Sequence, residues 1–374
     1  MANSRSQRSG DAPRVLLLSG YDATSHQRWR EQLTALLPEY AWHTLTLPPR
    51  FFRWRIRGNP LSWLNEPAFR ESWDLVVATS MVDLASLRSF HPQLTQTPCL
   101  LYMHENQFAF PVSGTQAASV DPQMVNLYSA ISADRVVYNS AWNRDSFLDG
   151  ARDFLDKMPD GVPGGLIEAL REKSEVIPVP IEDRLFTEPA AATNWACPHL
   201  LWNHRWEYDK GPERLLKLLQ ALDRRSVPFR LSVVGERFRS HPPAFDQIRE
   251  QFPRHLEHWG FVPRRADYDR LLAEADVVLS TALHDFQGLS MLEAMASGCL
   301  PLAPDRLAYR EYVPDLCRYH SDPQNAEAEA EAAAACLQGL LQNQPPRCPP
   351  TPWRASVLAD AYRALFDRML RPVQ

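Results

Sequence analysis

The sequence predicts an α/β protein of two Rossmann-like domains that face each other across a cleft. A chain of 374 residues is long enough for two or three domains, and short apolar segments alternate with helical patterns along its length. Near-continuous apolar strands, each followed by a helix, are typical of a parallel sheet that is covered on both faces. The alternation stops between Pro178 and Pro198, where the prolines exclude an interior strand or helix. We therefore expect the two domains to be joined there.

The composition excludes several kinds of protein. Lysine and arginine number 40 against 45 acidic residues, so the net charge of −5 excludes a chain coated with basic residues for unselective nucleic-acid binding. Apolar runs such as Val15–Leu18 are too short to span a bilayer, so no integral membrane contact is expected. Residues 1–13 contain no apolar segment and are predicted to form a flexible tail without a secretory signal. The six cysteines form no C-x-x-C pair, which favours free thiols in the cytoplasm over a zinc site.

The N-terminal domain is predicted to cover residues 14–182. Its first buried strand is Arg14–Ser19, and the helix after it is His26–Leu37. Three further apolar segments predict strands: Asp74–Ala78, Cys99–Tyr102 and Arg135–Tyr138. Residues 183–198 are predicted to form a hinge linker, because they continue the proline-rich segment.

The second domain is predicted to cover residues 199–345, and residues 346–374 a connector and a C-terminal helix. The expected strands are His199–Asn203, Arg230–Val234, Leu256–Phe261, Asp276–Ser280 and Cys299–Leu302. The expected helices are Gly211–Leu222, Pro242–Phe252, Tyr268–Ala275, Leu289–Ala296 and, at the end of the chain, Trp353–Leu370. Ligands of such sheets bind at the carboxyl ends of the strands, so the residues that follow strands are the candidates for a site.

Two cations follow the first strand of the second domain. Arg205 and Lys210 lie between that strand and the helix that begins near Gly211. Positive side chains together with a helix N-terminus favour an anion such as a diphosphate. Taken alone, this segment is better explained by exposed cations that have no ligand, because such residues are common near helix starts.

Two acids and a glycine flank the start of a later helix in the same domain. Asp285 and Glu293 are eight positions apart, with Gly288 and Leu289 between them. Gly288 allows the backbone to approach a ligand, and Glu293, about one turn inside the helix, could accept hydrogen bonds from the hydroxyls of a ribose. The alternative is that Asp285 only caps the helix. Acids and cations at the strand ends of one domain together predict a nucleotide-sugar site.

These motifs resemble those of the retaining GT-B glycosyltransferases. The family's phosphate motif corresponds to Arg205, Lys210 and Gly211, and its donor motif to the segment from Asp285 to Gly298, with Asp285 in place of the usual glutamate. The resemblance implies a GT-B fold and a donor site that orients the hexose through Asp285 and the ribose through Glu293. The donor-binding residues that it implies are Asn203, Gly235, Phe261, Val262, Gly288, Leu289, Ser290 and Glu293, with Gly20 from the first domain.

The first half resembles one branch of this superfamily, the tRNA-queuosine α-mannosyltransferases. The segment Tyr102–Pro111 follows a strand, and the resemblance places its His104 against the donor hexose. His26, Glu105 and Asn106 are then expected to contact the acceptor. The resemblance implies that a hexose, mannose from GDP-mannose, is transferred to the queuosine base of tRNA with retention. It also implies that no metal or other cofactor is needed and that the leaving phosphate takes the acceptor's proton.

A segment of the first domain carries a signal for RNA that does not depend on this resemblance. Between Tyr40 and Asn65 there is no acid, while arginines and aromatics alternate: Arg50, Phe51, Phe52, Arg53, Trp54, Arg55, Arg57 and Trp63. Arginine pairs with phosphates and aromatics stack on unpaired bases, so the four arginines are candidates for binding a single-stranded loop of tRNA. A basic flap over the cleft, or a membrane-surface patch, fits the same residues.

Two other functions are compatible with the sequence. One is transfer of a sugar from another nucleotide to a lipid or small-molecule hydroxyl, and the other is a sugar-nucleotide sensor without catalysis. In the enzyme, Arg205 and Lys210 would stabilise the diphosphate that leaves, which is the largest expected contribution to the rate. The sequence makes no prediction of the oligomeric state.

Overall fold

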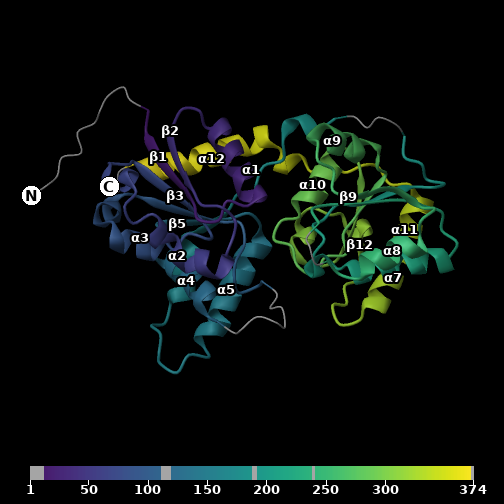
Figure 1. The fold of residues 1–374 in the computed structure, drawn as a ribbon, viewed down its shortest axis with the longest axis horizontal. Helices are drawn as coiled ribbons and strands as arrows, with labels where there is room; N and C mark the ends of the chain where they lie inside the picture. Colours follow the sequence, from purple (N-terminus) through teal and green to yellow (C-terminus); the bar gives the residue numbers. More distant parts are fainter. Residues whose placement is uncertain (1–11, 111–118, 188–191, 238–240, 372–374) are drawn as a thin grey trace, which may run out of the picture. The chain divides into compact units, whose positions relative to one another are not determined.

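The computed structural model describes residues 12–110, 119–187, 192–237 and 241–371 (Figure 1). The predicted tail, residues 1–13, lies almost wholly outside them. The chain divides into two compact units. Unit 1 comprises residues 1–139, 143–177 and 358–374, and unit 2 comprises residues 140–142 and 178–357. Each unit is built around its own hydrophobic core.

Unit 1 contains a six-stranded parallel sheet in the order β2-β1-β3-β4-β5-β6. Its strands are β1 (Arg14–Ser19), β2 (Ala41–Thr46), β3 (Leu75–Thr79), β4 (Cys99–Met103), β5 (Arg135–Tyr138) and β6 (Ser174–Val176). Its helices are α1 (Thr24–Leu36), α2 (Phe52–Ser62), α3 (Leu84–Phe90), α4 (Asp121–Ser132), α5 (Ala141–Leu155) and α6 (Leu166–Glu172). The strand order reverses between β1 and β3, which is where ligands bind in sheets of this kind.

Unit 2 contains a second parallel sheet of six strands, in the order β12-β11-β10-β7-β8-β9. Its strands are β7 (His199–Trp202), β8 (Arg230–Val234), β9 (Leu256–Gly260), β10 (Val277–Leu279), β11 (Leu300–Pro304) and β12 (Arg318–Tyr319). Its helices are α7 (Pro212–Arg224), α8 (Ala244–Gln251), α9 (Arg265–Glu274), α10 (Leu289–Ala296) and α11 (Ala326–Asn343). This is the Rossmann order, and its reversal lies between β7 and β10.

The segments that predicted strands all form strands, with ends that differ by one or two residues, and these strands are largely buried except β9 at a sheet margin. Sequence analysis missed three strands at sheet margins: β2, β6 and β12. Along β2 the side chains alternate between exposed and half-buried, and β12 has two residues. A strand at a margin has a neighbour on one side only, so it lacks the continuous apolar run by which a central strand is recognised. Helix α2 was missed because Pro60 lies inside it.

The chain crosses from unit 1 to unit 2 at Ile177–Pro178 and returns at Val357–Leu358. Within the predicted linker, Asp183–Leu185 is a short 3₁₀ helix in unit 2. The last helix, α12 (Ala355–Leu370), contributes residues from 358 onwards to unit 1. There the hydroxyl of Tyr362 accepts a hydrogen bond from the Trp29 indole (3.0 Å), so α12 packs beside α1 (Figure 1). Among the described residues, no helix is long and apolar enough to cross a bilayer.

Candidate active site

The loop between β7 and α7 carries the first candidate residues of unit 2. The loop ends at Gly211, which has a φ of 66°. Its Cα lies so close to the carbonyl oxygen of Thr281 that a Cβ added at this position would overlap that oxygen. The Thr281 hydroxyl in turn donates to the carbonyl of Lys210 (2.9 Å). These contacts join the loop after β7 to the segment after β10, at the reversal of the strand order.

Lys210 lies at the centre of this junction and is only 8% exposed. Its ammonium group donates to the carbonyl of His284 (2.8 Å) and is 3.3 Å from the Asp209 carboxylate and 3.8 Å from that of Asp285. The structure therefore brings together Lys210 and Asp285, which the sequence placed 75 positions apart. Arg205 is half exposed and forms an ion pair with Glu207 (2.9 Å).

Asp285 prepares the start of α10. One carboxylate oxygen accepts from the backbone N–H of Gly288 (3.0 Å) and the other from the hydroxyl of Tyr309 (3.2 Å). Burial alone would raise the pKa of Asp285, but the nearby Lys210 ammonium and neighbouring histidines lower it below its usual value, so the group is a carboxylate at neutral pH. Asp285 therefore does support the start of the helix, as the alternative interpretation states, but this is not its only contact, because the same carboxylate also faces Lys210.

Glu293 lies in the second turn of α10 and is 3% exposed. Its carboxylate pairs with the guanidinium of Arg265 at 3.1 Å. Arg265 is held from its other side by Asp269 (2.8 Å) and lies 5.4 Å from the ring of Tyr268. Arg265 therefore fixes the direction of the carboxylate that was predicted to bind the ribose.

We expect Arg265→Ala to raise the KM for the sugar nucleotide about 10-fold with a smaller change in kcat. The substitution removes the cation that orients Glu293, and this changes donor binding more than the chemical step. Arg265→Lys should restore part of the affinity. Steady-state kinetics and calorimetric titration with GDP check this. Arg264→Ala, at an exposed neighbouring arginine, is the control, and an Arg265→Ala enzyme with unchanged KM would refute the assignment.

His204, directly after Asn203, is buried, and burial lowers its pKa to about 4. In the unfolded chain a histidine titrates near 6.5. Between these values the unfolded state binds a proton that the folded state does not, so this group makes the free energy of unfolding fall as the pH falls. The slope is at most about 1.4 kcal/mol per pH unit.

We therefore expect His204→Asn to flatten the dependence of unfolding free energy on pH between about pH 6.5 and 4. Urea denaturation of both proteins at several pH values measures this. The comparison is of slopes, because the substitution also shifts stability by an amount that does not depend on pH. Parallel profiles would show that His204 takes up its proton equally in the folded and unfolded states.

The remaining predicted donor residues lie at the carboxyl ends of β7, β8 and β9. The amide nitrogen of Asn203 donates to the Ser290 carbonyl and to the hydroxyl of Tyr268, both at 3.0 Å. Gly235, after β8, passes so close to the His204 carbonyl that an added Cβ would overlap it. Phe261 is exposed and Val262 half-buried, directly after β9. All of them lie on the edge of the sheet that carries Lys210.

In unit 1 the predicted residues also collect at the carboxyl edge of the sheet. His26 of α1 and His104, after β4, stack with their ring centroids 4.1 Å apart. The Glu105 carboxylate is 3.3 Å from Nε2 of His26. Neither ring nitrogen of the buried His104 has a hydrogen-bond partner among the described residues. Burial, together with the neighbouring His26, lowers the pKa of His104 well below its usual value, so the ring is neutral and can donate to a hydroxyl.

Two other predicted residues of unit 1 have contacts that belong to the fold. The Asn106 amide nitrogen donates to groups of α5 that include the Ser146 hydroxyl (3.0 Å), and its oxygen accepts from the N–H of Phe108 and of Ala109. Asn106 thereby shapes the loop that holds His104. Gly20, after β1, passes close to the Met81 carbonyl, where an added Cβ would come within 3.0 Å.

The structure separates the four arginines that were predicted to bind RNA. Arg50 and Arg53 are exposed. Arg55 is buried and donates to the hydroxyl of Ser62 (3.4 Å), and Arg57 forms an ion pair with Asp83 (2.8 Å). Arg55 thus contributes to the packing of α2, whereas Arg50, Arg53 and the half-exposed Arg57 are presented to solvent.

Sequence reasoning missed several residues that surround the candidate site. They are Asp209, His204, Thr281, His284, Arg265, Tyr268 and Tyr309. Asp209 could have been noticed as the neighbour of Lys210. Arg265 gave no signal, because its pairing with Glu293 depends on how α9 and α10 pack together.

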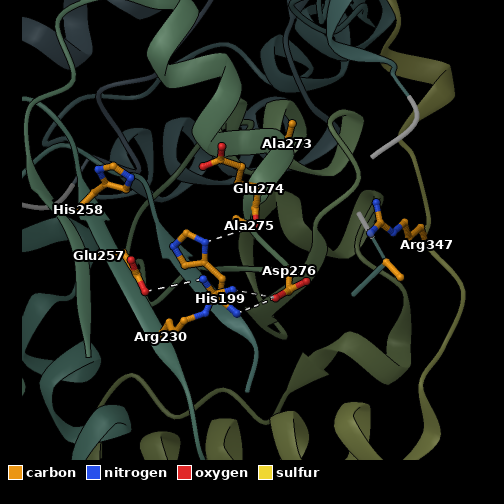
Figure 2. Close-up of a pocket in the computed structure, with 10 residues that line it drawn as sticks. His199, Arg230, Glu257, His258, Ala273, Glu274, Ala275, Asp276 and Arg347 are labelled. Atoms are coloured by element: carbon orange, nitrogen blue, oxygen red, sulfur yellow. Dashed lines mark hydrogen bonds and ion pairs between the residues drawn. The ribbon is translucent and has the colours of Figure 1, made fainter. Parts of the chain in front are cut away.

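A hollow of about 250 Å³ lies at the opposite edge of the same sheet, at the amino ends of β7, β8, β9 and β10 (Figure 2). Arg230 there lies between the carboxylates of Glu257 (3.7 Å) and Asp276 (3.9 Å). The Asp276 carboxylate also accepts a hydrogen bond from the backbone N–H of His199 (2.8 Å). Unit 1 contains an equivalent hydrogen bond, in which the Asp134 carboxylate accepts from the backbone N–H of Cys99 (2.7 Å). A contact repeated in both sheets indicates that this hollow is lined by structural groups. It is not where the predicted residues meet.

No group of three or more His, Cys, Asp or Glu side chains that could hold a metal ion occurs among the described residues. Independence from metal stays a prediction.

Comparison with known proteins identifies the class of this fold. Residues 198–344 match the family described as glycosyl transferases group 1. Solved structures with the same fold include Alr3699/HepE from Anabaena in complex with UDP and glucose (TM-score 0.63, 15% identity, 96% of this chain and 99% of that one). Another is the structure of trehalose-6-phosphate from Escherichia coli bound with UDP-2-fluoro glucose (TM-score 0.65, 13% identity, 96% of this chain and 99% of that one). The fold is that of the GT-B glycosyltransferases, which confirms the predicted fold class.

The particular family follows from the first half and from the whole chain. Residues 14–181 match the family described as tRNA-queuosine alpha-mannosyltransferase N-terminal. A Drosophila melanogaster protein named tRNA-queuosine alpha-mannosyltransferase is 31% identical over 317 residues, which cover 83% of this chain and 84% of the relative. This chain belongs to the tRNA-queuosine alpha-mannosyltransferase family, as the resemblance in its motifs predicted, and is a hexosyltransferase.

Proposed function

We propose that this protein transfers mannose from GDP-mannose to the queuosine base of tRNA, with retention at the anomeric carbon. The observation that carries the proposal is the 31% identity to the Drosophila melanogaster enzyme, which extends through both units rather than one. Because tRNA is the acceptor, we place the reaction in the cytoplasm.

The geometry of unit 2 supports a nucleotide-sugar donor. Lys210 is a buried cation next to the N-terminus of α10, so the two can stabilise a diphosphate as negative charge develops on it. Glu293, oriented by Arg265, is placed to accept hydrogen bonds from the ribose. Asp285 is ionised and can orient the hexose despite its shorter side chain.

The geometry of unit 1 supports contacts to the donor hexose through His104 and to a polar acceptor through His26 and Glu105, at the edge of its sheet. His104 is neutral, has no protein partner for either ring nitrogen among the described residues, and can donate to or accept from a sugar hydroxyl. His26 and Glu105 form a polar pair beside it. The acceptor's proton passes to the leaving phosphate oxygen, so the proposal assigns no residue as a separate base.

Incubation of the purified protein with GDP-mannose and tRNA, followed by mass analysis of the nucleosides, tests this function. We expect a hexose to be added to queuosine in tRNA that contains it. Matched reactions contain tRNA without queuosine, or UDP-glucose in place of GDP-mannose, and neither should give product. Transfer from UDP-glucose, or to a nucleoside other than queuosine, would overturn the donor or the acceptor. No transfer from any donor would favour a sugar-nucleotide sensor.

A further inference from the structure

We propose that the start of α2 and the two residues before it are a docking surface for unpaired nucleotides of an RNA. This surface is formed by Arg50, Phe51, Arg53 and Trp54 and is here called the α2 platform. This inference rests on the proposed function, since it assigns the part of the protein that holds the tRNA. The α2 platform would bind RNA at residues other than those assigned to the transfer reaction.

The two aromatic side chains of the α2 platform are unusually exposed for their size. Phe51 is 71% exposed and Trp54 is 56% exposed. Phe51 has a φ of 56°, a left-handed conformation that is strained for a bulky residue. The Trp54 indole lies against Gly58, where an added Cβ would come within 2.5 Å of the ring. One face of the indole thus rests on the helix, while more than half of the side chain remains open to a partner.

The charge of the α2 platform suits a polyanion. Arg50 and Arg53 are exposed, and the guanidinium of Arg50 lies 5.7 Å from the centre of the Phe51 ring. No acid occurs from Tyr40 to Asn65, in a chain whose net charge is −5. Aromatic faces that stack on bases, beside arginines that pair with phosphates, are the combination by which proteins hold single-stranded RNA.

The α2 platform is held firmly at the ligand edge of unit 1. The side-chain amide of the buried Asn59 donates to the Met81 carbonyl (3.0 Å) and accepts from the N–H of Asp83 (3.2 Å), both in the segment after β3. Phe52 contacts Tyr21, which follows β1, with the ring centroids 6.1 Å apart. Helix α2 is therefore attached to the segments after β1 and β3, where the strand order reverses (Figure 1). His26 and Glu105 lie on the same edge.

These contacts favour RNA over a lipid surface as the occupant. The apolar residue Ile56 of α2 already packs inward against Met81 and Val125. The exposed side chains at the start of α2 are a pair of aromatics flanked by arginines, and the exposed Leu61 lies about two turns further along the helix. They do not form a continuous apolar face of the kind that inserts into a bilayer.

The test measures the affinity of the full chain for a fluorescent RNA hairpin with an unpaired loop. We expect Phe51→Ala with Trp54→Ala to weaken binding about 10-fold or more, and Trp54→Phe, which keeps an aromatic face, to weaken it less than 3-fold. Leu61→Ala, at an exposed apolar residue of the same helix, is the matched control and should leave binding unchanged. Arg50→Gln with Arg53→Gln should make the binding constant depend less on salt. The slope of log K against log salt concentration should become smaller in magnitude by about 1.4, which corresponds to two lost phosphate contacts.

The outcomes separate this inference from the proposed function. If the wild-type protein glycosylates tRNA and the aromatic double variant binds the hairpin as tightly as wild type, the docking surface is wrong and the function stands. If the double variant loses hairpin binding but wild type transfers no sugar, the surface stands and the function is wrong. Loss of binding to vesicles of anionic phospholipid, with hairpin binding unchanged, would overturn the α2 platform in favour of a membrane patch. Unchanged melting temperatures are expected, because the substituted side chains are exposed.

Discussion

Substitution of Lys210 by alanine is expected to lower kcat about 100- to 1000-fold. The buried ammonium lies 3.8 Å from Asp285 and beside the start of α10, so it can stabilise charge that develops on the leaving diphosphate. In a buried site that is shielded from water this contribution is larger in the transition state than in the bound substrate. Steady-state kinetics at saturating donor and acceptor measure the loss, with the KM for the donor recorded separately.

The control has to separate chemistry from folding, because removal of Lys210 leaves the carboxylates of Asp209 and Asp285 without their nearest cation. A melting curve of each variant shows whether unit 2 remains folded. Lys217→Ala, on the exposed face of α7 where Lys217 pairs with Glu327 (2.7 Å), is the matched lysine substitution and should retain full activity. A folded Lys210→Ala enzyme with kcat within 3-fold of wild type would show that Lys210 does not act on the leaving group.

Gly211→Ala is expected to lower the free energy of unfolding by about 3 kcal/mol or more. Two effects add at this position. The φ of 66° is unfavourable for alanine, and the new methyl group would overlap the backbone carbonyl oxygen of Thr281, which cannot move aside as a flexible side chain could. Chemical denaturation followed by far-ultraviolet circular dichroism measures the change.

Two other glycines separate these effects. Gly165 has a φ of 85° with nothing within 4 Å of an added Cβ, so Gly165→Ala should lose only about 1–2 kcal/mol of stability through the backbone conformation. Gly339 lies inside α11 with open space around it, and Gly339→Ala should stabilise by up to about 1 kcal/mol. If Gly211→Ala were no worse than Gly165→Ala, the close approach between the two loops would not constrain the site.

The candidate site shows which of its residues can be predicted from the sequence. The motif around Lys210 and the motif from Asp285 to Glu293 were assigned to one site because each follows a strand, and the structure places Lys210 and Asp285 within 4 Å of each other. The support for Glu293 could not be assigned in this way. Arg265 occurs in a stretch with two other arginines and two aspartates, and only the packing of α9 against α10 distinguishes it from the other arginines.

The segment predicted to bind RNA shows the opposite case, in which the sequence offered more candidates than the fold presents. In the sequence, the four arginines of the segment cannot be told apart, because all of them lie in the same acid-free stretch among aromatic residues. The helical path of α2 turns Arg55 inward and pairs Arg57 with Asp83, although Arg57, like Arg50 and Arg53, remains exposed. Whether an arginine of this helix is buried, paired or free depends on residues from other segments of the chain, such as Asp83, and the local sequence does not reveal them.

The sequence alone determined the two α/β units, the buried strands and the motifs of a nucleotide-sugar site. These depend on the order of residues along a strand or helix, and hydrophobic periodicity and short motifs record that order directly. The tertiary structure decided the marginal strands, the return of α12 to unit 1, the pairing of Arg265 with Glu293 and the stacking of His26 on His104. Such contacts join residues far apart in the chain, and their energy becomes available only when the sheets and helices have packed.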